Sequence, residues 1–277
     1  MELDSTRLVF IGGLHRSGTT PLARAMAEHP AISGLRDTGV KEDEGQHLQS
    51  VYPKAKVYGG PGRFALDQRS HLTEESPLVT EANAQILFDA WAPYWDLGRP
   101  LLLEKSPPNL VMGRFLQAIY PGSAFIAVVR HPIVVALSTV KWRRLASKNF
   151  QNHTTVHAMV EHWLSAHETL RDDLASLSRT HLLRYEDLVD DPDRQLGPVQ
   201  QLLGLHEPIP SGSLRSTHSD RYEQTWSELS TGSWLDRRKR RSIEKDFGER
   251  VAAFGYDISD LAARQPFPLA EATGTET

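Results

Sequence analysis

The stretch GGLHRSGTT, residues 12–20, decides how the rest of the chain is interpreted. Gly13 and Gly18 have the spacing of the phosphate-binding loop G-x-x-x-x-G-K-[ST], but Thr19 follows where that loop carries lysine. A cation precedes the second glycine instead, at Arg16. The stretch joins an apolar run to a helix-like stretch, and backbone N–H groups at such a turn bind anions. We therefore predict an anion site that does without the lysine, the alternative being a Gly-rich turn with Ser and Thr as helix caps.

Apolar runs that are typical of buried strands alternate with stretches of helical spacing. The predicted strands are Leu8–Gly12, Leu101–Glu104, Phe125–Val129 and the weaker His181–Tyr185, and the clearest helices are Thr20–His29 and Val156–Leu177. Strands that alternate with helices favour a parallel sheet covered by helices, so we predict an α/β fold. The Gly- and Pro-rich residues 50–80 and the polar residues 205–233 interrupt the pattern, and we predict long loops there.

Length, charge and composition narrow the function classes. The 277 residues carry a formal net charge of -4 and no cysteine, which excludes thiolate chemistry and gives no indication of nucleic-acid binding. We expect one domain over residues 1–263 and a disordered tail over residues 264–277, which lack apolar periodicity. No apolar run approaches the ~20 residues of a membrane span or resembles a signal peptide. We therefore expect a cytoplasmic protein without a membrane partner, or a soluble piece of a larger one, of unknown oligomeric state.

Cations follow two of the predicted strands, at the edge where open α/β sheets bind ligands. Arg130 follows the strand that ends at Val129, and Ser138 lies about two turns along the helix that Pro132 can begin. Arg130 and Ser138 together suit a phosphate. Lys105 likewise follows an apolar strand and suits an anionic group in transfer. Taken one at a time, each is equally well explained as an ordinary exposed side chain.

The stretch LLRYEDLVDDP, residues 182–192, follows the weakest strand. Tyr185 is placed to lie near a nucleotide base or phosphate. Glu186 and Asp187 are better explained as acids in the first turn of the next helix, where the helix dipole favours them.

Four motifs occur in a specific order along the chain. They are RSGTT (residues 16–20), RHPIVVALS (residues 130–138), RYEDL (residues 184–188) and FGY (residues 254–256). This order resembles the sulfotransferase superfamily that uses 3′-phosphoadenosine 5′-phosphosulfate (PAPS), over about residues 7–257. The resemblance implies a P-loop-like, three-layer α/β fold with a central parallel sheet flanked by helices. It also implies a transferase whose acceptor is a small molecule or carbohydrate with a hydroxyl or, less in keeping, an amine.

The resemblance assigns roles to individual residues. The residues it places on the 5′-phosphosulfate are Arg16, Ser17, Gly18, Thr19 and Thr20, and those it places on the 3′-phosphate and nucleotide are Arg130, Ser138 and Tyr185. Arg16 stands where many cytosolic members carry lysine, and with Lys105 it would stabilise the charge that develops during transfer. This scheme requires no metal.

Two departures from the family limit this assignment. Cytosolic small-molecule members often carry a catalytic histidine two residues after the equivalent of Lys105, where this sequence has Pro107. Their late Arg-Lys-Gly element is also missing, since the stretch Ser230–Arg241 shares only Gly232 and Trp234 with it. We interpret the basic run at residues 237–241 as a solvated helix face.

The general base is expected in RDTGVKEDEGQHLQ, residues 36–49, which follows the first predicted helix. Carbohydrate and tyrosine sulfotransferases have a similar layout, with a catalytic glutamate in this segment. Glu44 and His47 have the i,i+3 spacing that places two side chains on one helix face, so we predict Glu44 as the base with His47 assisting. Glu42 and Asp37 are the competing carboxylates, and a solvated acidic turn is the alternative.

Other functions and the acceptor stay open at this point. A nucleotide kinase or triphosphatase is disfavoured because Thr19 replaces the lysine and no strand clearly ends in a magnesium-binding acid. A non-catalytic nucleotide-binding module is the third hypothesis. Aromatic residues that line an acceptor pocket or belong to the core are Tyr52, Tyr58, Phe64 and Trp91.

Overall fold

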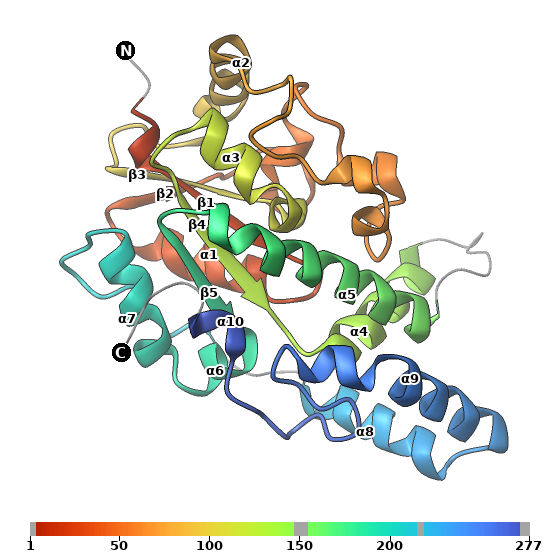
Figure 1. The fold of residues 1–277 in the computed structure, drawn as a ribbon. Coiled ribbons are helices and arrows are strands. Elements are labelled where there is room, and N and C mark those ends of the chain that lie inside the picture. The colour runs from red at the N-terminus through yellow and green to blue at the C-terminus, as the bar shows by residue number, and fades with distance from the viewer. Residues whose placement is uncertain (1–3, 147–154, 215–218, 272–277) are drawn as a thin grey trace.

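The fold is built on a parallel β-sheet, seen in a computed structural model that describes residues 4–146, 155–214 and 219–271 (Figure 1). The strands, in the spatial order β2-β3-β1-β4-β5, are β1 (Leu8–Gly13), β2 (Ile32–Gly34), β3 (Leu101–Lys105), β4 (Ala124–Val129) and β5 (Thr180–Arg184). The α-helices are α1 (Thr19–Glu28), α2 (Glu81–Trp91), α3 (Gly113–Ile119), α4 (Pro132–Ala146), α5 (Val156–Asp173), α6 (Tyr185–Asp190), α7 (Pro192–Leu202), α8 (Ser219–Thr231), α9 (Trp234–Ala252) and α10 (Pro268–Glu271). Within the described ranges, no helix combines the length and hydropathy needed to cross a bilayer.

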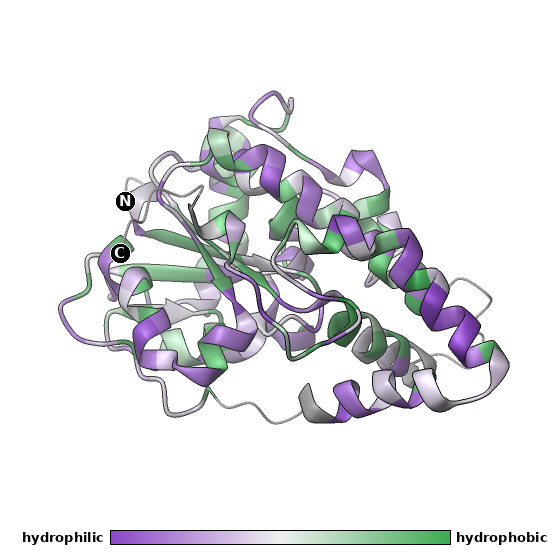
Figure 2. Ribbon diagram, turned by 60° about the horizontal axis from the view of Figure 1, so that its bottom comes forward, coloured by the Kyte–Doolittle hydropathy of each residue, from purple (hydrophilic) through white to green (hydrophobic). Residues whose placement is uncertain are grey.

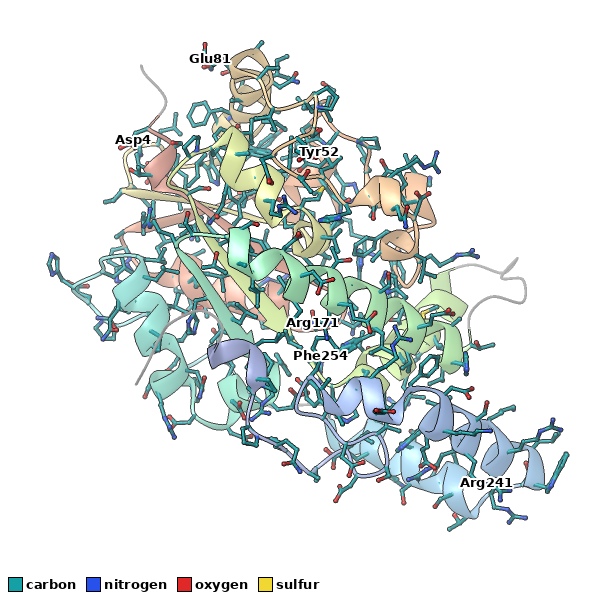
Figure 3. The ribbon with its side chains drawn as sticks, in the orientation of Figure 1. Asp4, Tyr52, Glu81, Arg171, Arg241 and Phe254 are labelled. Carbon is teal, nitrogen blue, oxygen red and sulfur yellow. The ribbon has the colours of Figure 1, made fainter. Side chains whose placement is uncertain are left out.

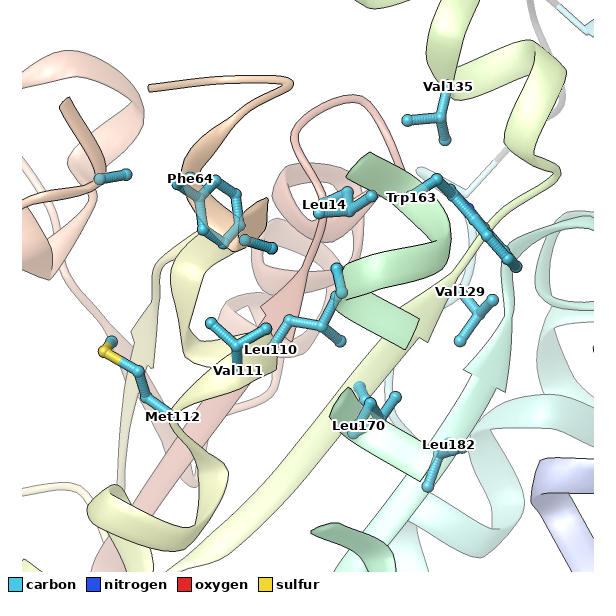
Figure 4. Close-up of a cluster of buried hydrophobic side chains, with 14 of the residues drawn as sticks. Leu14, Phe64, Leu110, Val111, Met112, Val129, Val135, Trp163, Leu170 and Leu182 are labelled. Carbon is cyan, nitrogen blue, oxygen red and sulfur yellow. The ribbon is translucent and has the colours of Figure 1, made fainter. Parts of the chain in front are cut away.

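Side-chain alternation along the strands produces three layers. On β1, Leu8 and Phe10 belong to one apolar cluster, while Val9 and Ile11 belong to another on the opposite face. The first cluster is shared with α2, α3 and α5, and the second with α1, α6 and α7. The strands are therefore mostly hydrophobic, with polar residues mainly at strand ends, whereas the outer helices mix both kinds of residue (Figure 2). Figure 4 shows part of the first cluster, with Trp163 of α5 beside the end of the sheet. The predicted three-layer α/β fold is confirmed.

The strand register places the predicted anion-binding elements at one edge of the sheet. Ile11 of β1 pairs with Lys105 of β3, and Val129 of β4 pairs with Arg184 of β5. Because all the pairs are parallel, the loops after β1, β3, β4 and β5 leave the sheet on the same side. β1 lies between β3 and β4, so these loops converge around the end of β1.

Short or sparsely apolar elements escaped prediction from the sequence. β2 has three residues, too few to form a recognisable apolar run. The polar region 205–233 contains α8, whose inward stripe consists of Tyr222, Trp226 and Leu229, with only Trp226 fully buried. Residues 50–80 are irregular as predicted and contain short 3-10 helices.

The prediction of a disordered tail from Arg264 is wrong for residues 264–271. Arg264 forms an isolated antiparallel bridge with Tyr256, and its guanidinium contacts Asp190 at 2.5 Å. Leu269 of α10 is buried against the first apolar cluster. Gln265 also donates from its backbone N–H to the Gly255 carbonyl, and such scattered contacts produce no periodic pattern in the sequence. Residues 272–277 lie outside the described residues.

Candidate active site

The loop between β1 and α1 is shaped as an anion-binding turn. Arg16 and Gly18 adopt left-handed backbone angles, with φ of 76° and 101°. Gly18 is the N-cap of α1 and no described side chain caps the helix, so the N–H groups of Thr19 and Thr20 have no intrahelical partner. Ser17 serves the turn itself, because both its backbone N–H and its buried hydroxyl donate to the Leu14 carbonyl.

A cavity of about 310 Å³ lies over this loop. It is bordered by His15, Arg16, Gly18, Thr19, Thr20, Pro21, Lys41, Glu42, Glu44, Pro107, Arg130, Thr139, Trp142 and Tyr185. The cavity thus brings together most of the residues that the sequence assigned to the nucleotide and the expected base. Ser17, Ser138, Lys105 and His47 do not border it, although Ser138 contacts Arg16, and Lys105 and His47 contact Glu44.

The two motifs that are predicted to bind phosphate contact one another. Arg16 Nε donates to Ser138 Oγ at 2.9 Å, and Arg130 Nη1 donates to the Arg16 carbonyl at 3.0 Å. The Arg130 guanidinium lies 4.2 Å from the centre of the Tyr185 ring. A β-carbon at position 18 would come within 2.2 Å of that same ring, so the loop glycine allows the tyrosine to cover the turn. Arg130, Tyr185 and the loop form one packed unit.

Glu44 is a buried carboxylate surrounded by donors. Its Oε1 lies 3.5 Å from Lys105 Nζ, and its Oε2 lies 3.5 Å from His47 Nε2 and accepts from Gln46 Nε2 at 2.7 Å. Burial alone would raise the pKa of Glu44, but the hydrogen bond with His47 and the charge of Lys105 outweigh it and lower that pKa to about 2. Glu44 is therefore ionised at neutral pH.

The segment that carries Glu44 is not the continuous helical turn that the i,i+3 spacing suggested. Glu44 is extended and separates two 3-10 helices, Lys41–Asp43 and Gly45–His47. The side chains of Glu44 and His47 still meet, because the His47 backbone N–H donates to the Glu44 carbonyl and closes a single turn between the two residues.

The competing carboxylates lie toward a second cavity of about 390 Å³, next to the first. Asp37 and Glu42 are exposed at its border, and Glu42 lies 3.5 Å from Arg24. Lys105 also borders this cavity and donates to the Glu42 carbonyl at 2.9 Å. Thr20 and Glu42 border both cavities, which makes the second a candidate entrance for an acceptor.

Three residues of the site were missed by sequence reasoning. His15 borders the main cavity, and its enclosed Nδ1 has no hydrogen-bond partner among the described residues. Burial lowers the pKa of His15 to about 4, so its ring is neutral at pH 7. Lys41 Nζ lies 3.7 Å from the centre of the Trp142 ring, which brings the segment with the predicted base against α4. Two of these residues could have been found from the sequence. His15 directly precedes Arg16, and Trp142 lies one helical turn after Ser138.

The aromatic residues considered for an acceptor pocket belong mainly to the core. Tyr52, Phe64 and Trp91 are buried in the first apolar cluster, with Tyr52 labelled in Figure 3 and Phe64 in Figure 4. Tyr58 packs only partly against it, under Arg69. None of the four borders the main cavity.

The motifs in the C-terminal part of the chain differ in their relation to the main cavity. Glu186 does not cap α6 but accepts from the His131 backbone N–H and the Tyr256 hydroxyl, each at 2.9 Å, which links RYEDL, RHP and FGY. The basic run on α9 does not border the main cavity, and Arg241 lies at the far end of the hairpin of α8 and α9 (Figure 3).

Comparison with known proteins identifies the family. The sulfotransferase family model matches residues 9–208, and the chain belongs to this family. The chain is 28% identical over 223 residues to omega-hydroxy-beta-dihydromenaquinone-9 sulfotransferase Stf3 of Mycobacterium bovis, covering 76% of this chain and 55% of that protein. It is 25% identical over 200 residues to the protein-tyrosine sulfotransferase of Drosophila melanogaster, covering 72% and 38%. It therefore spans about half or less of the length of these relatives.

A solved structure supports the fold independently. The sulfotransferase domain of the Synechococcus PCC 7002 olefin synthase superposes with a TM-score of 0.53 at 19% identity, covering 90% of this chain and 94% of that one. The central sheet and flanking helices are thus those of a sulfotransferase fold.

Proposed function

We propose that this chain transfers a sulfuryl group from PAPS to the hydroxyl of an acceptor. The observation that carries the proposal is a single cavity in which the first turn of α1, Arg16 and Arg130 face the ionised carboxylate of Glu44. Anion-binding groups and a proton acceptor in one cavity are what transfer from an anionic donor to a hydroxyl requires. Family membership narrows the transferred group to sulfuryl.

The nucleotide would lie across the unit formed by the loop, Arg130 and Tyr185. The open N–H groups at Thr19 and Thr20 would receive the 5′-phosphosulfate together with Arg16. Arg130 would bind the 3′-phosphate, with Ser138 holding Arg16 in place. The cations of this scheme are side chains, so we propose that no metal takes part.

Transfer would proceed by attack of the acceptor oxygen on sulfur. The new O–S bond forms as the bond from sulfur to the phosphate oxygen breaks, and the electron pair leaves with 3′-phosphoadenosine 5′-phosphate (PAP). The acceptor proton becomes strongly acidic as the O–S bond forms, so the weakly basic Glu44 carboxylate is sufficient to take it. Lys105, 3.5 Å from Glu44, would stabilise charge on the transferring group, and His47 would orient the carboxylate.

A hydroxyl acceptor is supported over an amine by the relatives. The names of the mycobacterial and Drosophila enzymes describe a hydroxylated menaquinone and a protein tyrosine as acceptors. We propose a small molecule or carbohydrate with an accessible hydroxyl, entering beside Glu42 from the second cavity.

Thermal unfolding with and without PAP tests the nucleotide assignment. At 100 times its Kd, PAP stabilises a protein by about 2.7 kcal/mol, which raises Tm by several degrees. We expect this shift without magnesium, and ATP with magnesium serves as the control. Incubation with PAPS and hydroxylated compounds, followed by mass spectrometry, then detects sulfated products. The absence of a shift with PAP would refute the proposal, magnesium-dependent ATP hydrolysis would favour a triphosphatase, and binding without any product would favour a non-catalytic module.

A further inference from the structure

A second carboxylate lies beneath the proposed base. Glu104, the penultimate residue of β3, is 1% exposed and accepts three hydrogen bonds. Its Oε1 accepts from the Gly45 backbone N–H at 2.9 Å and from Ser106 Oγ at 2.6 Å, and its Oε2 accepts from Asn109 Nδ2 at 2.6 Å. A buried carboxylate is tolerated only when such bonds satisfy it, so Glu104 and the three residues that donate to it hold one another in place.

These bonds attach the segment around the base to the sheet. Gln46 N–H donates to Ser106 Oγ at 3.0 Å, and Trp91 Nε1 donates to the Gly45 carbonyl at 3.1 Å. A β-carbon at Gly45 would lie 2.6 Å from both Cγ and Oε1 of Glu104, so only glycine permits this approach. The segment is therefore held on both sides by buried partners.

The contact between Gly45 and Glu104 lies next to the contact between Glu44 and Lys105, because Glu44 precedes Gly45 and Lys105 follows Glu104 in the sequence. Gly45 and Glu104 are in contact, and their neighbours Glu44 and Lys105 meet at 3.5 Å. Because backbone geometry couples adjacent residues, a shift at the first contact displaces the second. We propose that Glu104 is a positioning residue that holds Glu44 against Lys105, an inference that rests on the proposed function because Glu44 is the base there.

Another buried carboxylate provides a matched control. Glu186 is 8% exposed and accepts from the His131 backbone N–H and from Tyr256 Oη. His131 follows Arg130, so Glu186 supports the 3′-phosphate end of the cavity instead of the reacting end. The same substitution at Glu104 and Glu186 therefore replaces a buried carboxyl by an amide in two different halves of the site.

The experiment compares Glu104→Gln with Glu186→Gln by three measurements. Hydrogen–deuterium exchange of a peptide spanning residues 41–48 should accelerate in Glu104→Gln and stay unchanged in Glu186→Gln. Steady-state kinetics should show kcat reduced by roughly 100-fold in Glu104→Gln, because displacement of a catalytic group by about 1 Å costs this much. The Kd for PAP should remain within about threefold of wild type in Glu104→Gln and weaken in Glu186→Gln.

Each result bears on a different part of the inference. Unchanged exchange in the 41–48 peptide of Glu104→Gln overturns the positioning role, and faster exchange with unchanged kcat overturns its link to the reaction. If Glu104→Gln does not fold, Gly45→Ala disturbs the same contact from the other side and should give the same three results. Failure of the wild-type protein to form any product from PAPS refutes the proposed function while leaving the exchange measurement valid.

Discussion

Arg16 and Ser138 lie 122 residues apart in sequence, and their side chains are joined by a hydrogen bond of 2.9 Å. The bond links the loop after β1 to helix α4. Arg130 completes the connection by donating to the Arg16 carbonyl at 3.0 Å. The two elements of the proposed nucleotide site are therefore already in contact, and a nucleotide that contacts both would not have to draw them together.

Replacement of Arg130 by lysine should weaken PAP binding despite the conserved charge. Lysine cannot stack flat on Tyr185 and bond the Arg16 carbonyl while also presenting a planar pair of donors to a phosphate. Loss of a charge-assisted hydrogen bond costs about 1.5–3 kcal/mol, which is a 10- to 150-fold increase in Kd. Titration calorimetry with PAP measures it, with the exposed Arg241→Lys as the control. Equal affinity in Arg130→Lys would place the 3′-phosphate elsewhere.

Replacement of Glu44 by glutamine should abolish most of the transfer without loss of PAP binding. The amide keeps the shape but cannot accept the acceptor proton, and general bases contribute about 10²- to 10⁴-fold to kcat. The matched control is Glu42→Gln, since Glu42 is two residues away and exposed. An equal loss of kcat in Glu42→Gln would move the base to that residue.

Replacement of Gly18 by alanine should destroy the nucleotide site. The φ of 101° is unfavourable for alanine, and the new β-carbon would collide with the Tyr185 ring at 2.2 Å. We expect no thermal shift with PAP in this variant. Gly248→Ala is the control, because Gly248 lies inside α9 with open space around it, and alanine there should stabilise the helix by up to about 1 kcal/mol. Normal PAP binding by Gly18→Ala would show that the turn is not the binding element.

Buried histidines should make the fold sensitive to mild acid. Burial lowers the pKa of His167 from 6.5 to about 4, and that of His131 likewise. Between the unfolded-state pKa of 6.5 and the folded-state pKa of about 4, the unfolded chain binds protons that the folded chain does not. The contribution of these histidines to stability is therefore complete above pH 6.5 and is lost as pH falls toward 4. Each such histidine costs about 2 kcal/mol at pH 5.

The change in Tm between pH 7 and pH 5 measures this effect. His167→Phe keeps an aromatic ring stacked on Trp163 but cannot be protonated, so its Tm should fall less than that of wild type. The exposed His206→Asn should behave as wild type does. An identical fall in Tm for all three proteins would show that His167 is protonated in the folded state.

The positions of the cations at the strand ends could be predicted from the sequence because they depend on a local pattern. Arg130 and Lys105 each follow an uninterrupted apolar run, and the parallel register brings both runs to the edge where the loop from Gly13 lies. The assignment of Ser17 to the 5′-phosphosulfate stays a prediction, because a hydroxyl next to a tight turn can serve either a ligand or the turn, and here it bonds to Leu14. The short β2 and the sparse apolar stripe of α8 lacked a periodic signal.

Four strands of the sheet, the loop after β1 and the family could be predicted from the sequence, because periodicity and closely spaced motifs are set by residues that are neighbours in the chain. The way in which Glu44 is held became visible only in the folded chain. Lys105, which contacts Glu44, and Glu104, which contacts the neighbouring Gly45, lie on a strand about 60 residues further along the chain, as the 59-residue separation of Gly45 and Glu104 shows, and no local pattern predicts this approach. That approach depends on a glycine and a carboxylate packed in the interior, where an unsatisfied charge would be too costly to persist.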